Sequence, residues 1–173
     1  MGKRSSFERI PRDFYPTPAS AVVPLLPHLA SRTRFCEPCA GDGALVDHLT
    51  AAGHVCARAR DIEPRRADIE CKDALTTLTG NIDCFITNPP WDRKVLHPMI
   101  VHLSMQAPTW LLFDADWIHT RQASPFMPSL VKMVSVGRVK WIADSPFTGK
   151  DNCAWHLFNV RNVAPAQLYG RAA

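Results

Sequence analysis

Short apolar runs alternate with loops and amphipathic segments along this chain. Most of the runs contain valine, isoleucine, leucine or phenylalanine and end close to glycine, proline or aspartate, a pattern typical of buried strands. We expect strands over residues 34–37, 54–60, 82–87, 109–113, 133–142 and 153–160. The run at 133–142 is interrupted by Gly137 and Arg138, so it predicts either two strands or one bent strand.

Two segments between these runs predict helices. Residues 44–52 place their large apolar side chains on one side and are followed by Gly53, a common helix stop. Residues 19–30 also have helical character, but Pro24 and Pro27 should kink or shorten a helix there because proline lacks an amide hydrogen. Strands that alternate with helices predict an α/β domain with a largely parallel sheet.

The length and composition are those of one globular domain. The 173 residues suffice for one full core, and we expect a single domain over 1–173, with residues 1–12 as a loose basic arm. No apolar run approaches the length of a membrane span, and the charged start MGKRSSFERIPRD lacks the apolar segment of a secretory signal. We therefore expect a cytoplasmic protein without membrane contact.

Six cysteines in such a chain predict reduced thiols. Cys36 and Cys39 form a CxxC pair, but no second pair or histidine cluster completes a zinc site. The sequence around the pair is not thioredoxin-like, so a redox role is not indicated. We expect no metal.

The chain is mildly basic, with a net charge of +4 and a pI of about 8.8. Positive side chains cluster within residues 1–12 and again within 58–66. A phosphate-binding surface and an ordinary solvated surface are equally compatible with these clusters. The charge therefore permits a nucleic-acid partner without requiring one.

A glycine-containing turn follows the first predicted strand, in the stretch FCEPCAGDG that ends at Gly43. Gly41 and Gly43 allow the backbone to turn closely beneath a ligand and enter a helix. Asp61 ends the next strand, about twenty residues on, where a carboxylate can accept hydrogen bonds from both ribose hydroxyls. Val46 stands where a dinucleotide fingerprint has its third glycine. The site therefore suits a nucleoside without a pyrophosphate, although a plain tight turn is the simpler interpretation of the glycines alone.

Another candidate for chemistry is the stretch ITNPPW, which ends at Trp91. Asn88 offers a side-chain carbonyl, and Pro89 offers a backbone carbonyl next to Pro90, which has no N–H. Two rigidly held acceptors fit a planar NH2 group that donates two hydrogen bonds, and Trp91 offers a flat face for stacking. A structural proline turn with a core tryptophan fits these four residues equally well.

Taken together, these motifs resemble those of class I S-adenosylmethionine-dependent amino-methyltransferases, particularly DNA adenine-N6 methyltransferases. The resemblance runs over residues 13–158 and is carried by the order of the motifs. It implies a Rossmann-like class I methyltransferase fold, with a mostly parallel seven-stranded sheet and flanking helices. It also implies S-adenosylmethionine as the cofactor and DNA as the partner, with RNA as an alternative.

The resemblance also implies roles for individual residues. It places Tyr15, Thr17 and Pro18 against the methionine moiety, and it assigns Asp61 and Ile62 to the ribose. The positions implied for the cofactor loop are Glu37, Pro38, Ala40, Gly41 and Gly43, and those implied for the adenine of the cofactor are Asp73 and Ala74. The implied catalytic residues are Asn88, Pro89, Pro90 and Trp91, with tryptophan where tyrosine or phenylalanine is more usual. Residues 155–158, WHLF, resemble a late strand motif that flanks the target base.

One departure from the family concerns target recognition. Members that recognise DNA sites usually carry a separate recognition domain, for which this chain leaves little room. Residues 117–132 are a candidate insert, although we favour an ordinary helix-and-loop connection there, and a partner protein could supply recognition. RNA adenine and protein glutamine remain alternative substrates, because both have a planar NH2 group. A non-catalytic cofactor-binding subunit is the alternative from another class.

Overall fold

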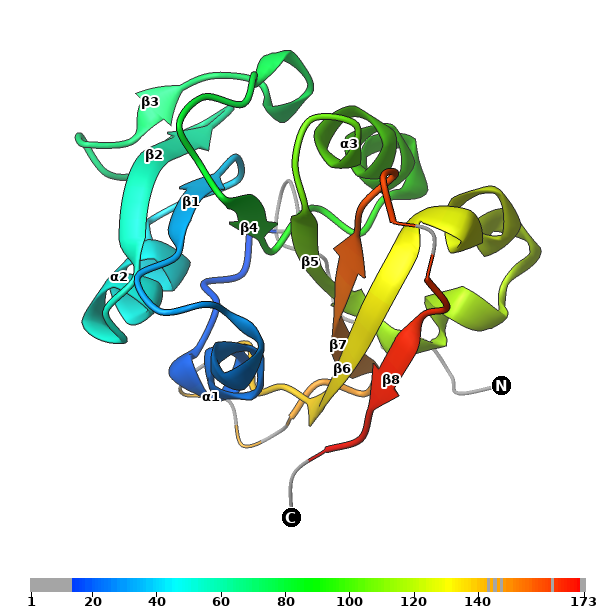
Figure 1. Cartoon of the computed structure of the whole chain (residues 1–173). Helices are drawn as coiled ribbons and strands as arrows, with labels where there is room; N and C mark the ends of the chain where they lie inside the picture. Colours follow the sequence, from blue (N-terminus) through cyan, green and yellow to red (C-terminus); the bar gives the residue numbers. More distant parts are fainter. Residues whose placement is uncertain (1–13, 143, 145, 147, 163, 172–173) are drawn as a thin grey trace.

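The computed structural model describes residues 14–142, 144, 146, 148–162 and 164–171. The expected basic arm, 1–12, lies outside the described residues. The fold is an α/β structure built on one eight-stranded sheet in the order β3-β2-β1-β4-β5-β7-β6-β8 (Figure 1). The strands are β1 Arg34–Glu37, β2 Val55–Asp61, β3 Glu70–Cys71, β4 Cys84–Thr87, β5 Thr109–Asp114, β6 Leu130–Arg138, β7 Asn152–Phe158 and β8 Gln167–Tyr169.

The sheet is mostly parallel, as the sequence predicts, and only β7 runs antiparallel to its neighbours β5 and β6. The expected number of seven strands is wrong. The eighth strand, β8, pairs parallel with β6, and its three residues are too few to show the apolar alternation by which a strand is recognised in a sequence. The strand β3 at the opposite edge has only two residues and is likewise too short to show such a pattern.

Both faces of the sheet are covered, because alternate side chains along a strand point to opposite faces. Phe35, Ile86 and Trp110 contribute to the core cluster that α1, η2 and α2 cover. Their strand neighbours Phe85 and Leu111 contribute to the clusters beneath α3. The helical elements are α1 Ala19–Val22, η2 Val23–His28, α2 Ala44–Ala51, η3 Ala74–Thr76, α3 Arg93–Ser104, η4 Ala115–His119 and η5 Arg121–Ser129.

Three segments differ from the helices and strands expected. The predicted helix at 19–30 continues as the 3-10 helix η2 after one α-helical turn, because prolines interrupt the α-helical hydrogen bonding. The run at 133–142 belongs to a single strand, β6, which begins earlier and ends at Arg138. The candidate insert at 117–132 is largely the pair of 3-10 helices η4 and η5, an ordinary connection.

The direction of β7 determines which connection lies at the edge of the sheet where the parallel strands have their carboxyl ends. Because β7 is antiparallel to β5, Cys153 near its start pairs with Asp114 at the end of β5, and Asn152 pairs with Arg138 at the end of β6. The connection between β6 and β7 therefore lies at the same edge as the carboxyl ends of β1, β2, β4 and β5. This edge is where ligands bind in open α/β sheets. In the described part of the chain, no helix is long and apolar enough to cross a membrane.

Candidate active site

A pocket opens at the carboxyl ends of β1, β2 and β4. Among the residues predicted to contact cofactor or substrate, its lining comprises Tyr15, Thr17, Glu37, Pro38, Ala40, Gly41, Asp61, Ile62, Asp73, Ala74, Asn88 and Pro90. Four predicted residues, Pro18, Gly43, Pro89 and Trp91, are not part of this lining. Residues that the sequence analysis missed complete the wall, notably Leu75 of η3 and Val95 and Met99 of α3. The fold thus brings most of the scattered motifs to one cavity.

The glycine turn has the backbone geometry that only glycine adopts readily. Gly41 has φ +54° and Gly43 has φ +84°, both in the left-handed region. A Cβ atom on Gly41 would lie 2.7 Å from the ring of Phe14, and one on Gly43 would collide with the guanidinium of Arg66. Phe14 therefore packs against the turn at Gly41 and Arg66 packs against it at Gly43, so neither position has room for a side chain.

Asp61 joins the end of β2 to the glycine turn. Its Oδ2 accepts a hydrogen bond from the Gly41 amide at 2.8 Å, and its Oδ1 accepts one from the Glu63 amide at 2.7 Å. A carboxylate oxygen can accept two hydrogen bonds, so each oxygen retains capacity for a further donor. Asp61 therefore both shapes the loop and keeps acceptors available at the pocket that it lines.

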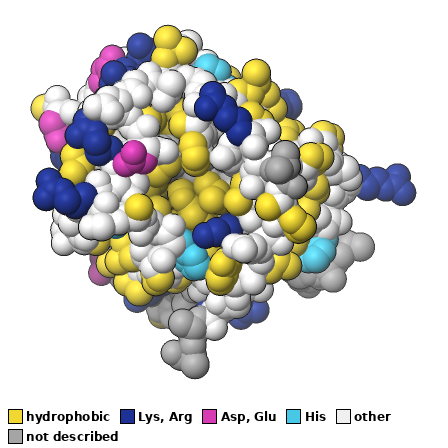
Figure 2. All heavy atoms as spheres, in the orientation of Figure 1, with side chains coloured by type: hydrophobic (Ala, Val, Ile, Leu, Met, Phe, Trp, Pro, Cys, Tyr) yellow, Lys and Arg dark blue, Asp and Glu magenta, His cyan; other side chains and the backbone are white. Residues whose placement is uncertain are grey.

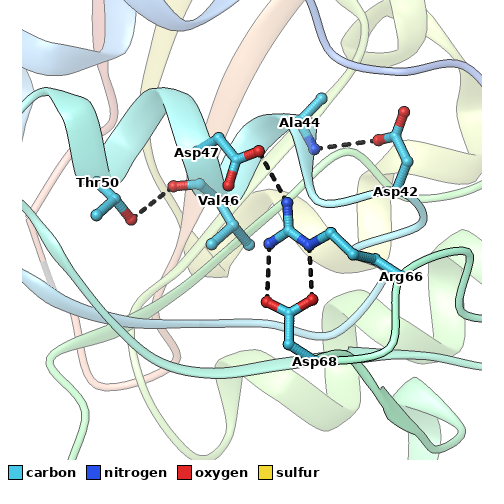
Figure 3. Close-up of polar contacts among 7 residues, drawn as sticks. All are labelled: Asp42, Ala44, Val46, Asp47, Thr50, Arg66 and Asp68. Atoms are coloured by element: carbon cyan, nitrogen blue, oxygen red, sulfur yellow. Dashed lines mark hydrogen bonds and ion pairs between the residues drawn. The ribbon is translucent and has the colours of Figure 1, made fainter.

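Arg66 fastens the segment after β2 to the first turn of α2 (Figure 3). Its Nη1 donates to Asp47 at 2.8 Å, while its Nε and Nη2 donate to Asp68 at 2.7 and 3.2 Å. In the same view, Asp42 accepts from the Ala44 amide at the start of α2. The sequence analysis placed Arg66 only in a basic cluster, because nothing in the local pattern indicates which carboxylates it meets.

Glu37 is a buried carboxyl group that lines the pocket, and its side chain is 2% exposed. Among the described residues, its Oε2 has no hydrogen-bond partner. Burial raises the pKa of Glu37 well above its usual value, and the nearby carboxylates of Asp61 and Asp42 raise it further. A cationic donor in the pocket would satisfy this oxygen and favour the charged form.

Asp73 caps the short helix η3, with its Oδ1 accepting from the Leu75 amide at 2.8 Å. The end of η3 is held by α3 and the turn that follows it: His102 Nε2 of α3 lies 2.8 Å from the Thr77 carbonyl, and Gln106 Nε2, just beyond α3, donates to the same carbonyl at 3.1 Å. Asp73 is thus placed at the pocket by a segment that α3 supports.

Asn88 follows the last residue of β4 and reaches the N-terminal segment of the described chain. Its Nδ2 donates to the backbone carbonyl of Tyr15 at 3.3 Å and to Oγ1 of Thr17 at 3.2 Å. No donor in the described ranges bonds its Oδ1, and Asn88 lines the pocket. The side-chain carbonyl is therefore the available group of this amide.

Two tryptophans meet at the carboxyl-end edge of the sheet. The rings of Trp91 and Trp141 are 6.1 Å apart and nearly perpendicular, and Tyr15 lies 6.3 Å from Trp141. Trp141 belongs to the connection between β6 and β7, and the sequence analysis missed it because the contact joins positions fifty residues apart in a segment without periodicity. Aromatic faces thus gather at the same edge of the sheet as Asn88.

The late strand motif at 155–158 does not flank the pocket, which corrects the role that the resemblance implied. Trp155, His156 and Phe158 are fully buried in β7, and Trp155 donates its indole hydrogen to the Ala21 carbonyl at 2.7 Å. His156 stacks on Phe113 with ring centroids 3.9 Å apart. These side chains belong to the core because β7 lies inside the sheet between β5 and β6.

The six cysteines are free thiols, and Cys36, Cys84 and Cys153 are buried. Burial raises the pKa of Cys36 to about 12, so this thiol stays protonated at neutral pH. Within the described ranges, no group of three or more histidine, cysteine or acidic side chains is arranged to hold a metal ion.

The comparison with solved structures finds a similar fold in class I methyltransferases. No protein-family profile matches the sequence, and no curated protein matches it significantly. A Listeria monocytogenes protein assigned to the class I S-adenosylmethionine-dependent methyltransferases aligns with a TM-score of 0.60 and 10% identity, over 97% of this chain and 68% of its own. A protein of Pyrococcus horikoshii assigned to the RNA methyltransferases aligns with a TM-score of 0.60 and 13% identity, over 91% of this chain and 92% of its own.

The M protein of the type I restriction enzyme EcoKI also shares the fold. It aligns with a TM-score of 0.56 and 11% identity, over 91% of this chain and 48% of its own. At these identities the similarity shows the Rossmann-like methyltransferase fold, which confirms the fold class that the sequence predicts.

Proposed function

We propose that this protein transfers the methyl group of S-adenosylmethionine to the exocyclic N6 amine of an adenine in DNA that is extruded from the helix or unpaired. The observation that carries the proposal is the meeting of two kinds of group in one pocket. Glu37, Asp61 and Asp73 offer acceptors suited to a nucleoside cofactor, and Asn88 offers an oriented acceptor for an amine at the same cavity.

The residues present fit this cofactor. The Oε2 of buried Glu37, which has no donor within the described part of the chain, suits the ammonium group of the methionine moiety, since a buried acceptor without a donor is costly. Asp61 has acceptor capacity for the ribose hydroxyls, and Asp73 has a second carboxylate oxygen for the adenine amine. The exposed apolar side chains of Ile62 and Leu75 line the same pocket and suit the faces of a purine.

The cofactor, when bound, supplies a methyl group that its sulfonium charge already activates. The protein mainly has to align the substrate amine with this methyl group. Holding the reacting atoms close in the right geometry can substantially lower the activation free energy of methyl transfer. Asn88 Oδ1 and the Pro89 carbonyl accept the two amine hydrogens, and Trp91 stacks on the base. No strong base is required, because the amine becomes acidic only after methyl transfer and its proton can leave to water.

Two alternatives differ in substrate, and one lacks activity altogether. RNA as the substrate is supported by the structural similarity to the Pyrococcus protein assigned to the RNA methyltransferases, as DNA is by the similarity to the M protein of the EcoKI restriction enzyme. Protein glutamine also carries a planar NH2, but the tryptophan pair at Trp91 and Trp141 favours a flat ring. Against a non-catalytic subunit, the Asn88 amide is held with an oxygen that no donor among the described residues bonds, a feature that cofactor binding alone does not need.

The proposal is tested by offering cofactor with a labelled methyl group together with separate pools of duplex DNA, single-stranded DNA, ribosomal RNA and protein. We expect label in DNA, and more in the single strand than in the duplex, because extruding a base costs a few kcal/mol. Label confined to protein would reject the nucleic-acid substrate. Cofactor binding without transfer to any pool would favour the non-catalytic alternative.

Replacing Asp61 with alanine should weaken cofactor affinity. Loss of one partner of a buried hydrogen bond leaves the other unsatisfied, at a cost of about 1–3 kcal/mol, and the variant also loses the bonds to the Gly41 and Glu63 amides. Isothermal titration measures the affinity. Asp83→Ala is the matched control, because Asp83 also accepts from a backbone amide, that of Arg34 at 2.7 Å, at the opposite edge of the sheet. Unchanged affinity in a folded Asp61→Ala protein would mean that the ribose binds elsewhere.

Binding to DNA should be sensitive to salt and only loosely selective for sequence. Lysine and arginine side chains are dispersed over the face drawn in Figure 2, where they can contact phosphates without reading base edges. We expect methylated adenines in many sequence contexts when a long unmethylated DNA is mapped after reaction. Methylation restricted to one site of six or more defined bases would show that the chain has a recognition element that we have not identified.

A further inference from the structure

Thr17 makes a contact that its implied role at the methionine moiety does not explain. Its hydroxyl oxygen accepts a hydrogen bond from Asn88 Nδ2 at 3.2 Å, across seventy-one positions of sequence. The side chain of Thr17 is 4% exposed, so the Thr17 end of this bond is shielded from water. A buried threonine at the junction of the cofactor pocket and the amide that faces the substrate can influence catalysis without touching the substrate.

The two bonds made by Asn88 define which way its amide points. The Tyr15 backbone carbonyl can only accept, so the group facing it must be the NH2 of the asparagine. The Thr17 hydroxyl takes the second hydrogen of that NH2. In the flipped orientation the Asn88 oxygen would face the Tyr15 carbonyl, which pairs two acceptors and leaves both unsatisfied. The flipped amide would also present donors to a substrate amine that itself donates.

The position of Thr17 is fixed by its surroundings. Pro16 and Pro18 flank it and restrict the backbone, since proline holds φ near −65°. Pro18 caps α1, and its carbonyl accepts from the Ala21 amide at 2.9 Å. The hydroxyl is therefore anchored by a stiff segment that continues into the packed helix α1.

We propose that Thr17 is a positioning residue for methyl transfer. Together with the Tyr15 carbonyl, its hydroxyl holds the Asn88 amide so that Oδ1, and not Nδ2, faces the amine of the substrate. This inference rests on the proposed function, and it assigns the Thr17 hydroxyl to the orientation of Asn88 and not to the cofactor.

The test compares the wild type with Thr17→Val and Thr17→Ser. Valine keeps the shape of threonine without the hydroxyl, and serine keeps the hydroxyl. We expect Thr17→Val to lower the single-turnover rate at saturating cofactor by about tenfold, as the loss of one net hydrogen bond implies. The Kd for S-adenosylmethionine should stay within about twofold, and Thr17→Ser should restore most of the rate.

Thr33→Val is the matched control. Thr33 is also 4% exposed, and its hydroxyl donates to the Ala30 carbonyl at 2.7 Å, away from the pocket. A purely structural effect of removing a buried hydroxyl should appear equally in both valine variants, whereas the change in rate should appear in Thr17→Val alone. A Thr17→Val protein with weakened cofactor binding and an unchanged single-turnover rate would overturn the inference.

A second measurement does not depend on activity. In a ¹⁵N-labelled protein, the Asn88 side-chain NH2 should be protected from hydrogen exchange in the wild type and in Thr17→Ser, and less protected in Thr17→Val. An unprotected Asn88 amide in the wild type would overturn the inference even if methyl transfer is observed. If the wild type transfers methyl groups to none of the pools but its Asn88 amide is protected, the proposed function is rejected, whereas the inferred orientation of Asn88 still holds.

Discussion

Replacing Asn88 with alanine is expected to lower the rate of methyl transfer by about two to four powers of ten, by analogy with other positioned polar groups. Asn88 is held at the end of β4 by two hydrogen bonds from its NH2, which leave its carbonyl as an oriented acceptor at the pocket. Alanine removes that acceptor, so the substrate amine loses one of its two partners and its alignment with the methyl group.

Cofactor affinity should change little in the same variant, because Glu37, Asp61 and Asp73 remain in place. Single-turnover rates with labelled cofactor and isothermal titration separate the two effects. Asn162→Ala is a suitable control, since the Asn162 amide also donates to a backbone carbonyl, that of Ala164 at 2.8 Å, in a segment away from the pocket. Near-normal turnover by Asn88→Ala would reject the catalytic assignment.

The second large effect concerns acid stability and involves His156. This ring is fully buried among Phe113, Trp117 and Phe158, and neither ring nitrogen has a well-formed hydrogen bond within the described part of the chain. Burial lowers the pKa of His156 from 6.5 to about 3. Above pH 6.5 the ring is neutral in both the folded and the unfolded chain, so it has no effect on the pH dependence there.

Below pH 6.5 the unfolded chain binds a proton at this histidine that the folded chain does not. The free energy of unfolding should therefore fall by about 1.4 kcal/mol for each pH unit, and by about 2 kcal/mol at pH 5 from this residue alone. His156→Phe removes the titrating group and retains an aromatic ring in the stack. We expect this variant to lose less stability than the wild type between pH 6.5 and pH 4.

Denaturant unfolding at several pH values measures the difference. Other buried groups titrate as well, since burial lowers the pKa of His54 and raises that of Glu37, so the comparison is between variants and not between pH values alone. His119→Phe, at an exposed histidine of η4, is the control and should follow the wild type. Parallel pH profiles for the wild type and His156→Phe would mean that His156 is protonated in the folded protein.

Several of the predicted site residues that line the pocket stand where a short motif ends a strand. Glu37, Asp61 and Asn88 each follow or end an apolar run, and parallel strands bring their carboxyl ends to one edge. Helix α3 was not predicted, although Leu96 and Met99 belong to a buried stripe, because the segment RKVLHPMIVHLS contains proline and several polar residues. Val95 and Met99, the two residues of α3 that line the pocket, were therefore missed as well.

Contacts between distant segments could not be predicted from local pattern. Arg66 meets Asp47 only after α2 packs against the segment that follows β2, and Trp141 meets Trp91 only because the connection between β6 and β7 lies at the carboxyl end of the sheet. The late strand motif at 155–158 was misplaced for a related reason, because its aromatic character fits a substrate wall and a core strand equally well.

The pocket is expected to bring the methyl group of the cofactor to the N6 amine of adenine. This transfer is tested most directly by incubating the protein with unmethylated single-stranded DNA and S-adenosylmethionine that carries a trideuterated methyl group, followed by digestion to nucleosides and mass spectrometry. We expect trideuterated N6-methyladenine as the product, formed by the wild type and nearly absent with Asn88→Ala. Deuterated methyl groups found only on another base or on another position of adenine would contradict it.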